Sequence, residues 1–209
     1  MNPKSDSHHL PLSAFLKHGT ASVHDTLDKR IMELAPFANR ERFARFLRVQ
    51  VRLHHAAAPL YRENPVLARL LPGLWERSRL DAVVADCEDL GVDRALLEHD
   101  KTAATVRVED NAEALGWLYT CEGSTLGAAI LLKVARDRLG LSEHFGARHL
   151  AGHPAGRAPH WRHFKAALDD IALCDGERER ALAGAREAFS FVRGAVEELM
   201  RDEQVMVPR

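Results

Sequence analysis

The chain has 209 residues and a formal net charge of −1, with 46% hydrophobic and 28% charged residues. This length suits one domain with a substantial core and is barely enough for two, and the balanced charge does not favour nucleic acid as a partner. The longest apolar stretch, residues 126–132, is too short to span a bilayer, and the N-terminus has no apolar signal core. The three cysteines are widely spaced and form no CxxC pair, which suits a reducing compartment. We therefore expect a cytoplasmic protein without a membrane span.

The first half of the chain is predicted to be helical, with polar caps and Pro or Gly breaks between the helices. Helices are expected over residues 13–34, 39–61, 64–71 and 79–90. Ser13 and Asn39 are the predicted N-caps of the first two helices. Pro36 ends the first helix and Gly91 ends the fourth.

The second half is also predicted to be helical, and it begins with one long stretch over residues 110–139. Asp110 opens this stretch and Gly140 closes it. A seven-residue helix is expected after Ser142, then a loop over 152–159 and helices over 160–173 and 176–202. No segment alternates with the period of two that a strand requires. The sequence thus predicts an all-α, single-domain protein of seven to eight helices over residues 11–203, with flexible ends at 1–10 and 204–209.

The first helix presents a stripe of residues that suits a metal-bound ligand. Lys17, His24 and Asp28 are seven and four residues apart, so they share one face. A neutral imidazole binds iron through one nitrogen, and an acid one turn further on can fix the tautomer through the other. The alternative is that His24 is an ordinary inward-facing histidine of the core.

The long helix contains three glycines, although glycine costs about 1 kcal/mol relative to alanine inside a helix. Gly123 and Gly127 lie on one face with Tyr119 and Leu126, and they remove side chains from it. Something flat could then touch the backbone, and the helix could bend there. The alternative is a close crossing of two helices at small residues.

These two helices resemble those of a known family. The run Glu122-Gly123-Ser124-Thr125-Leu126-Gly127 after Gly116-Trp117-Leu118-Tyr119 resembles the distal helix of bacterial haem oxygenases. His24 matches the proximal haem ligand of that family. The resemblance covers about residues 16–170 and is greatest to the pseudomonad and neisserial subgroup.

The resemblance implies a fold and a reaction. One helical domain would hold haem between the proximal first helix and the glycine-kinked distal helix, with haem as both cofactor and substrate. With dioxygen and electrons from a separate reductase or ferredoxin, the ring would be cleaved to biliverdin, carbon monoxide and ferrous iron. His24 would ligate the iron, and Asp28 would orient His24.

On the distal side, the resemblance makes Gly123, Ser124 and Gly127 the catalytic segment, with Leu126 against the haem. A backbone packed this close would direct dioxygen towards a ring carbon and exclude a large acid. Some haem oxygenases carry a distal aspartate that organises water, but this motif has none. Arg79 is a candidate for that water network.

The residues that hold the haem edge would decide which ring carbon is cut. A lysine and a tyrosine are suitable propionate partners, and Lys17 and Tyr119 resemble those of family members that cut the α-meso bridge. The sequence therefore predicts biliverdin IXα. Lys133 is expected near the same edge, and Phe189 could wall the pocket. The alternatives are a solvated lysine for Lys17 and a core aromatic for Phe189.

The expected partners follow from this reaction. Arg45, Arg48 and Arg52 form a basic stripe on the second helix, either as a solvated face or as a docking surface for an acidic electron donor. A bilin-binding phytochrome is a possible acceptor of the product, and a monomer is the default. His54 and His55 are expected to be structural or exposed.

Three other classes of protein are weighed against this interpretation. A haem storage or transfer protein would need only His24. Helical enzymes of the thiaminase type need a carboxylate or cysteine constellation where this chain has glycines. A di-iron protein needs paired Glu-x-x-His motifs, and the sequence has none.

Overall fold

The computed structural model describes residues 10–108 and 110–201, and its regular elements are helices. In chain order they are α1 (Leu12–Glu33), α2 (Arg40–Arg62), α3 (Pro65–Leu70), η2 (Trp75–Arg77), α4 (Leu80–Asp89), α5 (Arg94–Ala103), α6 (Asn111–Ser124), α7 (Ala128–Leu139), η3 (Arg148–Leu150), α8 (Arg157–Asp169) and α9 (Asp175–Leu199). The described residues form isolated bridges from Ser142 but no sheet. The all-α prediction is therefore confirmed. The predicted flexible ends lie outside the described residues, apart from Leu10.

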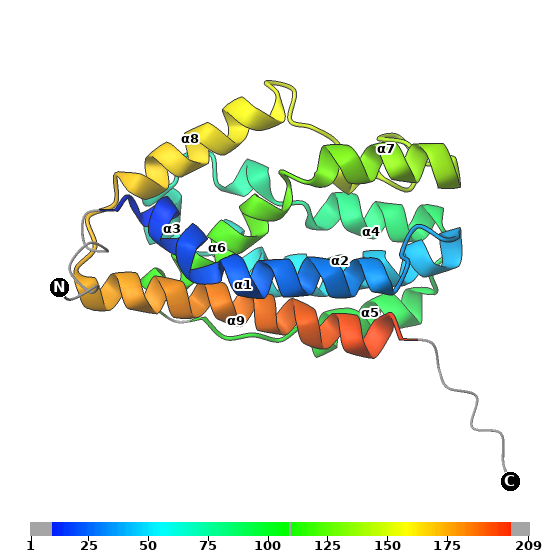
Figure 1. The fold of residues 1–209 in the computed structure, drawn as a ribbon, viewed down its shortest axis with the longest axis horizontal. Helices are drawn as coiled ribbons and strands as arrows, with labels where there is room; N and C mark the ends of the chain where they lie inside the picture. The colour runs from blue at the N-terminus through cyan, green and yellow to red at the C-terminus, as the bar shows by residue number, and fades with distance from the viewer. Residues whose placement is uncertain (1–9, 109, 202–209) are drawn as a thin grey trace, which may run out of the picture.

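The helices are arranged around α6, which runs through the middle of the molecule (Figure 1). Helices α1, α2 and α9 run alongside one another, while α7 and α8 lie on the other side of α6. The crossing of α6 with α9 is close because each helix contributes a glycine. A Cβ added at Gly116 would overlap the backbone oxygen of Ala181, and one at Gly184 would overlap that of Glu113. The close helix crossing expected as an alternative for the glycines therefore exists, but at Gly116.

Local capping signals located several helix ends correctly. The Asn39 side chain accepts a hydrogen bond from the Arg42 N–H at the start of α2. Asp110 accepts from two N–H groups at the start of α6. Gly140 ends α7 in the left-handed conformation, with φ of 65°.

Two predictions near helix starts were wrong. Helix α1 begins one residue before Ser13, whose N–H and hydroxyl donate to the Asp169 carboxylate of α8 at 2.7 and 2.9 Å. Helix α8 begins at Arg157, inside the predicted loop. Helix α5 was not predicted, although Asp93 caps it through the Ala95 N–H.

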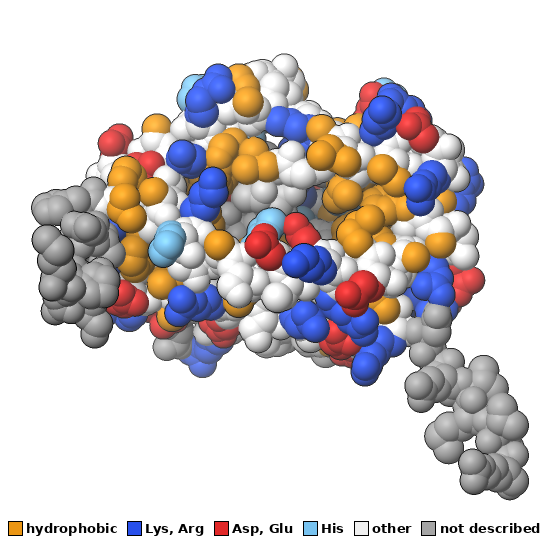
Figure 2. Space-filling view, in the orientation of Figure 1, with side chains coloured by type: hydrophobic (Ala, Val, Ile, Leu, Met, Phe, Trp, Pro, Cys, Tyr) orange, Lys and Arg blue, Asp and Glu red, His pale blue; other side chains and the backbone are white. Residues whose placement is uncertain are grey.

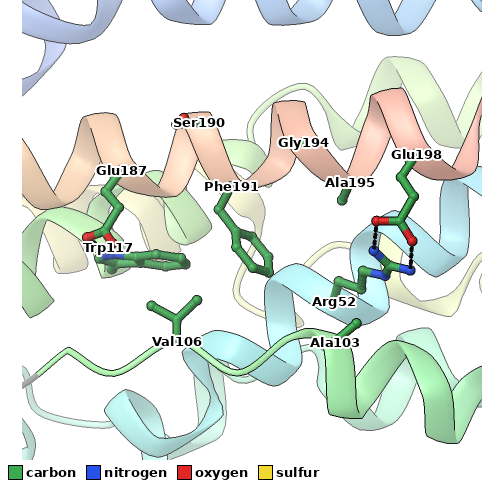
Figure 3. Close-up of a pocket in the computed structure, with 10 residues that line it drawn as sticks. All are labelled: Arg52, Ala103, Val106, Trp117, Glu187, Ser190, Phe191, Gly194, Ala195 and Glu198. Atoms are coloured by element: carbon green, nitrogen blue, oxygen red, sulfur yellow. Dashed lines mark hydrogen bonds and ion pairs between the residues drawn. The ribbon is translucent and has the colours of Figure 1, made fainter.

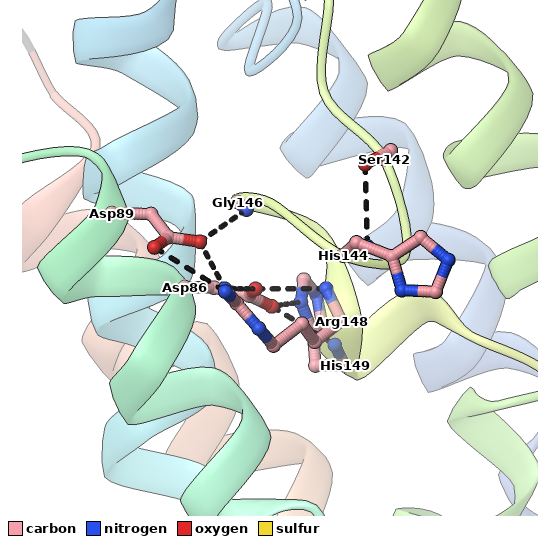
Figure 4. A network of polar contacts seen from close by, with 7 residues as sticks. All are labelled: Asp86, Asp89, Ser142, His144, Gly146, Arg148 and His149. Atoms are coloured by element: carbon pink, nitrogen blue, oxygen red, sulfur yellow. Dashed lines mark hydrogen bonds and ion pairs between the residues drawn. The ribbon is translucent and has the colours of Figure 1, made fainter.

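The segment after Ser142 is a turn rather than the predicted helix. Asp86 and Asp89 of α4 accept hydrogen bonds from the backbone N–H groups of Gly146, Arg148 and His149, as Figure 4 shows. Gly146 has φ of 72°, which a helix cannot accommodate. Two carboxylates from a distant helix therefore decide the path of this segment.

Candidate functional site

The long helix predicted over residues 110–139 is broken in the middle, at the glycine motif. Helix α6 ends at Ser124 and α7 begins at Ala128. The hydroxyls of Ser124 and Thr125 donate to the carbonyls three residues earlier, at 2.7 Å each. The Leu126 and Ala128 N–H groups also bond to carbonyls three residues earlier, as in a 3₁₀ turn. The motif therefore forms a tightened break, and we refer to residues 125–127 as the α6–α7 break.

Neither glycine of the motif is pressed against another helix, and Gly127 faces open space. A Cβ added at Gly127 would meet nothing within 4 Å, and one at Gly123 would meet only the Trp161 ring, at 3.9 Å. Beside them, the side chains of Leu126 and Ile130 remain 46% and 71% exposed. Bare backbone flanked by exposed apolar side chains is the surface that a flat, apolar ligand requires.

A recess runs along this side of the molecule. Figure 2 shows the surface hollowed between α1 and the arch of α7 and α8, with hydrophobic side chains along the hollow and charged side chains of both signs at its edges. The recess is thus bounded by the helix that carries His24 and by the helices on either side of the α6–α7 break.

His24 lies on α1, and its side chain is 53% exposed, so it is not a satisfied core histidine. Its Nδ1 lies 3.5 Å from an Asp28 carboxylate oxygen and 3.7 Å from one of Asp25. Its ring meets the Phe189 ring of α9 edge to face, with 5.8 Å between centroids. Acidic groups at Nδ1 leave Nε2 as the nitrogen for a metal.

The carboxylate of Asp169 interacts with the start of α1 by hydrogen bonds and with Tyr119 through its charge. Ser13 donates to Asp169, and the pKa of Tyr119 is raised by burial and, secondarily, by the charge of Asp169. The Tyr119 ring packs against Trp161 at 5.8 Å. Lys17 is exposed one turn after Ser13. The placement of Lys17 and Tyr119 at one end of the recess stays a prediction.

Lys133 was expected near the edge that Tyr119 holds, within one long helix over residues 110–139. The α6–α7 break lies between the two residues, so they do not share one continuous helix. Lys133 is exposed on α7 and stays a prediction without that support.

The basic stripe of α2 is not available as a row of free charges. Arg48 and Arg52 both pair with Asp100 of α5, at 2.6 and 2.9 Å, and Asp100 is fully buried. Arg52 also pairs with Glu198 of α9, as Figure 3 shows, and Arg45 pairs with Glu41. The pairs of Arg48 and Arg52 join α2 to α5 and α9, whereas Arg45 pairs within α2. Neither interpretation of the stripe, a solvated face or a docking surface, is therefore right for Arg52.

The pocket in Figure 3 lies apart from the predicted site. It has a volume of about 380 Å³ and lies between α9, α2 and the segment after α5. None of the predicted site residues lines it. The predicted site is the open recess on the other side of α6.

A buried polar cluster next to Gly123 was missed by the sequence reasoning. Glu122 accepts a hydrogen bond from the Tyr61 hydroxyl at 2.9 Å and pairs with Arg77 at 2.8 Å. Burial raises the pKa of Glu122, while Arg77 and Tyr61 act against this rise. A carboxylate inside an otherwise apolar helix was the available signal, because a buried charge requires partners.

His54 of α2 is buried, and its Nδ1 has no hydrogen-bond partner among the described residues. Burial is the main cause that lowers the pKa of His54 to about 3, and the charges of His149 and Arg79 add to it. His149, which bonds to Asp86 through Nδ1 (Figure 4), has an unpartnered Nε2. His54 is therefore a neutral core residue, which confirms its structural reading.

The neutral state of His54 makes stability dependent on pH. In the unfolded chain the pKa of His54 returns to 6.5. Between pH 6.5 and 3 the unfolded state therefore binds a proton at His54 that the native state does not bind. This contribution is present above pH 6.5 and is lost as the pH falls. At pH 5 the free energy of unfolding should be about 2 kcal/mol lower than at pH 8 because of this residue.

Urea unfolding at pH 8, 6 and 5 measures this loss. The His54→Gln variant should lose about 2 kcal/mol less than the unmodified protein over this range. His144→Gln, at an exposed position, is the control and should keep the original dependence. An equal loss in the His54→Gln variant would contradict the prediction.

The site is thus a recess with one histidine on one wall and exposed backbone on the other. Among the residues described, no group of three or more His, Cys, Asp or Glu could hold a metal ion. An exposed histidine and an exposed glycine backbone are groups that suit haem, because its iron already has four ring ligands and needs only an axial ligand from the protein.

Comparison with known proteins agrees with this geometry. The haem oxygenase family model matches residues 10–198. The chain is 47% identical to haem oxygenase PigA of Pseudomonas aeruginosa over 173 residues, which cover 82% of this chain and 84% of the relative. It is 31% identical to a haem oxygenase of Xanthomonas campestris over 147 residues, covering 67% and 82% of the two chains.

A solved structure shows the same fold. The NO- and CO-bound haem oxygenase of Neisseria meningitidis superimposes with a TM-score of 0.81 at 36% identity, covering 91% of this chain and 92% of the other. The chain belongs to the haem oxygenase family. It is an enzyme that degrades haem, which excludes the storage, thiaminase-type and di-iron alternatives.

No helix among the described residues is long and apolar enough to cross a membrane.

Proposed function

We propose that this chain cleaves haem at the α-meso bridge to biliverdin IXα, with His24 as the axial ligand of the iron. Haem supplies the iron that activates dioxygen and the ring that is cleaved. The proposal rests on the half-exposed side chain of His24 on α1 and on the open space at Gly127 in the α6–α7 break.

His24 would bind iron through Nε2. Asp28, and Asp25 beside it, would accept the proton of Nδ1 and so keep the imidazole in one tautomer. Phe189 would restrict rotation of the imidazole through its edge contact. The roles of Asp28 and Phe189 would then be to orient the ligand.

On the opposite wall, the backbone at Gly123, Ser124 and Gly127 would lie against the ring, with Leu126 covering the adjacent apolar surface. Because this wall has no acidic side chain beside the ring, protons would have to come through water. Arg79 is a candidate to hold that water, since its charge acts on Glu122, His54 and His160.

The orientation of the ring would depend on Lys17 and Tyr119. A lysine ammonium and a phenol hydroxyl at one end of the recess can bind the two propionates, with Lys133 near the same edge. The influence of Asp169 on Tyr119, and its bonds to Ser13 one turn before Lys17, support a common location.

We predict that the Lys17→Ala, Tyr119→Phe double variant yields a mixture of biliverdin isomers, because its haem can rotate in the recess. The unmodified protein should yield the IXα isomer alone. Chromatography of the pigment formed from haemin, reductant and air measures the isomers. Lys29→Ala, an exposed lysine of the same helix, is the control, and a pure IXα product from the double variant would contradict the proposal.

The experiment that tests the whole function starts from a titration of the apoprotein with haemin, followed by reductant in air. A one-to-one histidine-ligated spectrum that decays to biliverdin IXα supports the proposal. A haem complex that persists under reductant and air contradicts it.

We further propose that the protein works in the cytoplasm, as a monomer by default, with electrons from a separate reductase or ferredoxin. Basic side chains lie at the edges of the recess in Figure 2, with acidic ones on the α1 side, and the basic ones would attract an acidic electron donor. A bilin-binding phytochrome is the proposed acceptor of biliverdin.

A further inference from the structure

The first residue of α8, Arg157, ties the α6–α7 break to a different part of the chain. Its Nη1 donates to the Thr125 carbonyl at 3.2 Å, and its Nη2 donates to the Leu150 carbonyl. Thr125 is the C-cap residue of α6 and the first residue of the break. One guanidinium therefore joins the break to the end of η3.

The hydrogen-bond partners of the Arg157 guanidinium are backbone carbonyls. Among the described residues it has no ion pair with a carboxylate, and burial, followed by the charge of Arg79, lowers its pKa. Burying part of a guanidinium that has only carbonyl partners costs folding free energy, because no opposite charge offsets the loss of water. A guanidinium is planar and has several N–H donors, so it can bridge two carbonyls in a fixed geometry.

A second arginine attaches the other side of the motif to the same helix. Arg77 pairs with Glu122 and donates through Nη2 to the His160 carbonyl, in the first turn of α8, at 3.0 Å. Its guanidinium also lies over the Phe164 ring of α8, 5.5 Å from its centroid. Helix α8 thus holds the chain at Glu122, before Gly123, and at Thr125, after it.

The other side of the break, at Leu126 and Gly127, receives no side-chain hydrogen bond from the described residues. A Cβ at Gly127 would meet nothing within 4 Å, and the Leu126 side chain is 46% exposed. Among the described residues, the side-chain hydrogen bond that holds the break to another element therefore comes from α8.

We propose that Arg157 is a positioning residue, which fixes the height of the α6–α7 break over the haem ring, with Arg77 as the second anchor. This inference rests on the proposed binding of haem against Gly123 and Gly127. Without Arg157, the Thr125 carbonyl loses a charged donor, and the break can move towards or away from the ring.

The test compares Arg157→Gln and Arg157→Lys with Arg162→Gln, an exposed arginine on the same helix. Hydrogen exchange of the apoprotein is measured by mass spectrometry over residues 122–131. Arg157→Gln should exchange there about tenfold faster than the unmodified protein, Arg157→Lys should fall between them, and Arg162→Gln should be unchanged. Equal exchange in all four proteins would overturn the inference.

The ferrous carbon monoxide complex provides the second readout. Arg157→Gln should shift the C–O stretching band and speed carbon monoxide release, because the distal wall has moved. A Gly127→Ala variant separates the two proposals. If Gly127→Ala shifts the band and Arg157→Gln does not, Arg157 has no positioning role. If neither shifts it although exchange is faster in Arg157→Gln, haem does not lie against the break, and the proposed function fails.

Discussion

Replacing His24 by alanine should weaken haem binding by more than about 100-fold, because even the loss of a hydrogen-bond partner of a ligating histidine costs roughly 10- to 100-fold. The fold should be unaffected, since the His24 side chain is 53% exposed and its ion-pair contacts are with exposed acids. The haem that still binds should lack the spectrum of an axial histidine.

Haemin titration followed by absorption spectroscopy measures this change, and urea unfolding checks the fold. His18→Ala is the matched control, because His18 is exposed on the same helix. Added imidazole should restore the histidine-type spectrum of the His24→Ala variant. An unchanged histidine-ligated spectrum in that variant would mean that another residue holds the iron.

The glycines of α6 and of the break should respond in opposite ways to a side chain. Gly116→Ala should lower the free energy of unfolding by about 3 kcal/mol, because its Cβ would overlap the Ala181 carbonyl where α6 crosses α9. Gly127→Leu should change it by less than about 1 kcal/mol, because the added side chain enters open space. In haem binding, however, Gly127→Leu should be the damaging change.

Two measurements on each variant separate these effects. Urea unfolding gives the stability of the apoprotein, and haemin titration gives the affinity for haem. Gly127→Leu should bind haem at least tenfold more weakly while it unfolds normally. If Gly127→Leu instead unfolds easily and the folded fraction binds haem normally, the glycine face is a packing surface.

The sequence by itself determined the features that depend on nearby residues. The caps at Asn39 and Asp110 and the glycine end at Gly140 need only hydrogen bonds within a few residues, and they were predicted correctly. The spacing of Lys17, His24 and Asp28 likewise needs only a helix, and His24 does lie within 3.5 Å of Asp28. The all-α class followed from the same local periodicity.

The tertiary structure alone decided the features that depend on residues far apart in the chain. Ser13 donates a hydrogen bond to Asp169, 156 residues away. The side chain that the sequence predicted as the N-cap of α1 therefore bonds to α8 instead. The turn after Ser142 follows from carboxylates of α4, and Arg48 and Arg52 of α2 pair with acids of α5 and α9.

The distinction between the glycines has the same origin. Sequence shows that Gly116, Gly123 and Gly127 lack side chains, but only the packing shows which of them meets another helix and which faces the recess. The partners of Glu122, and the attachment of the break to Arg157, also come from distant elements. Local pattern thus predicted which residues would form each wall of the site, and long-range contacts decided how the α6–α7 break is attached to the rest of the fold.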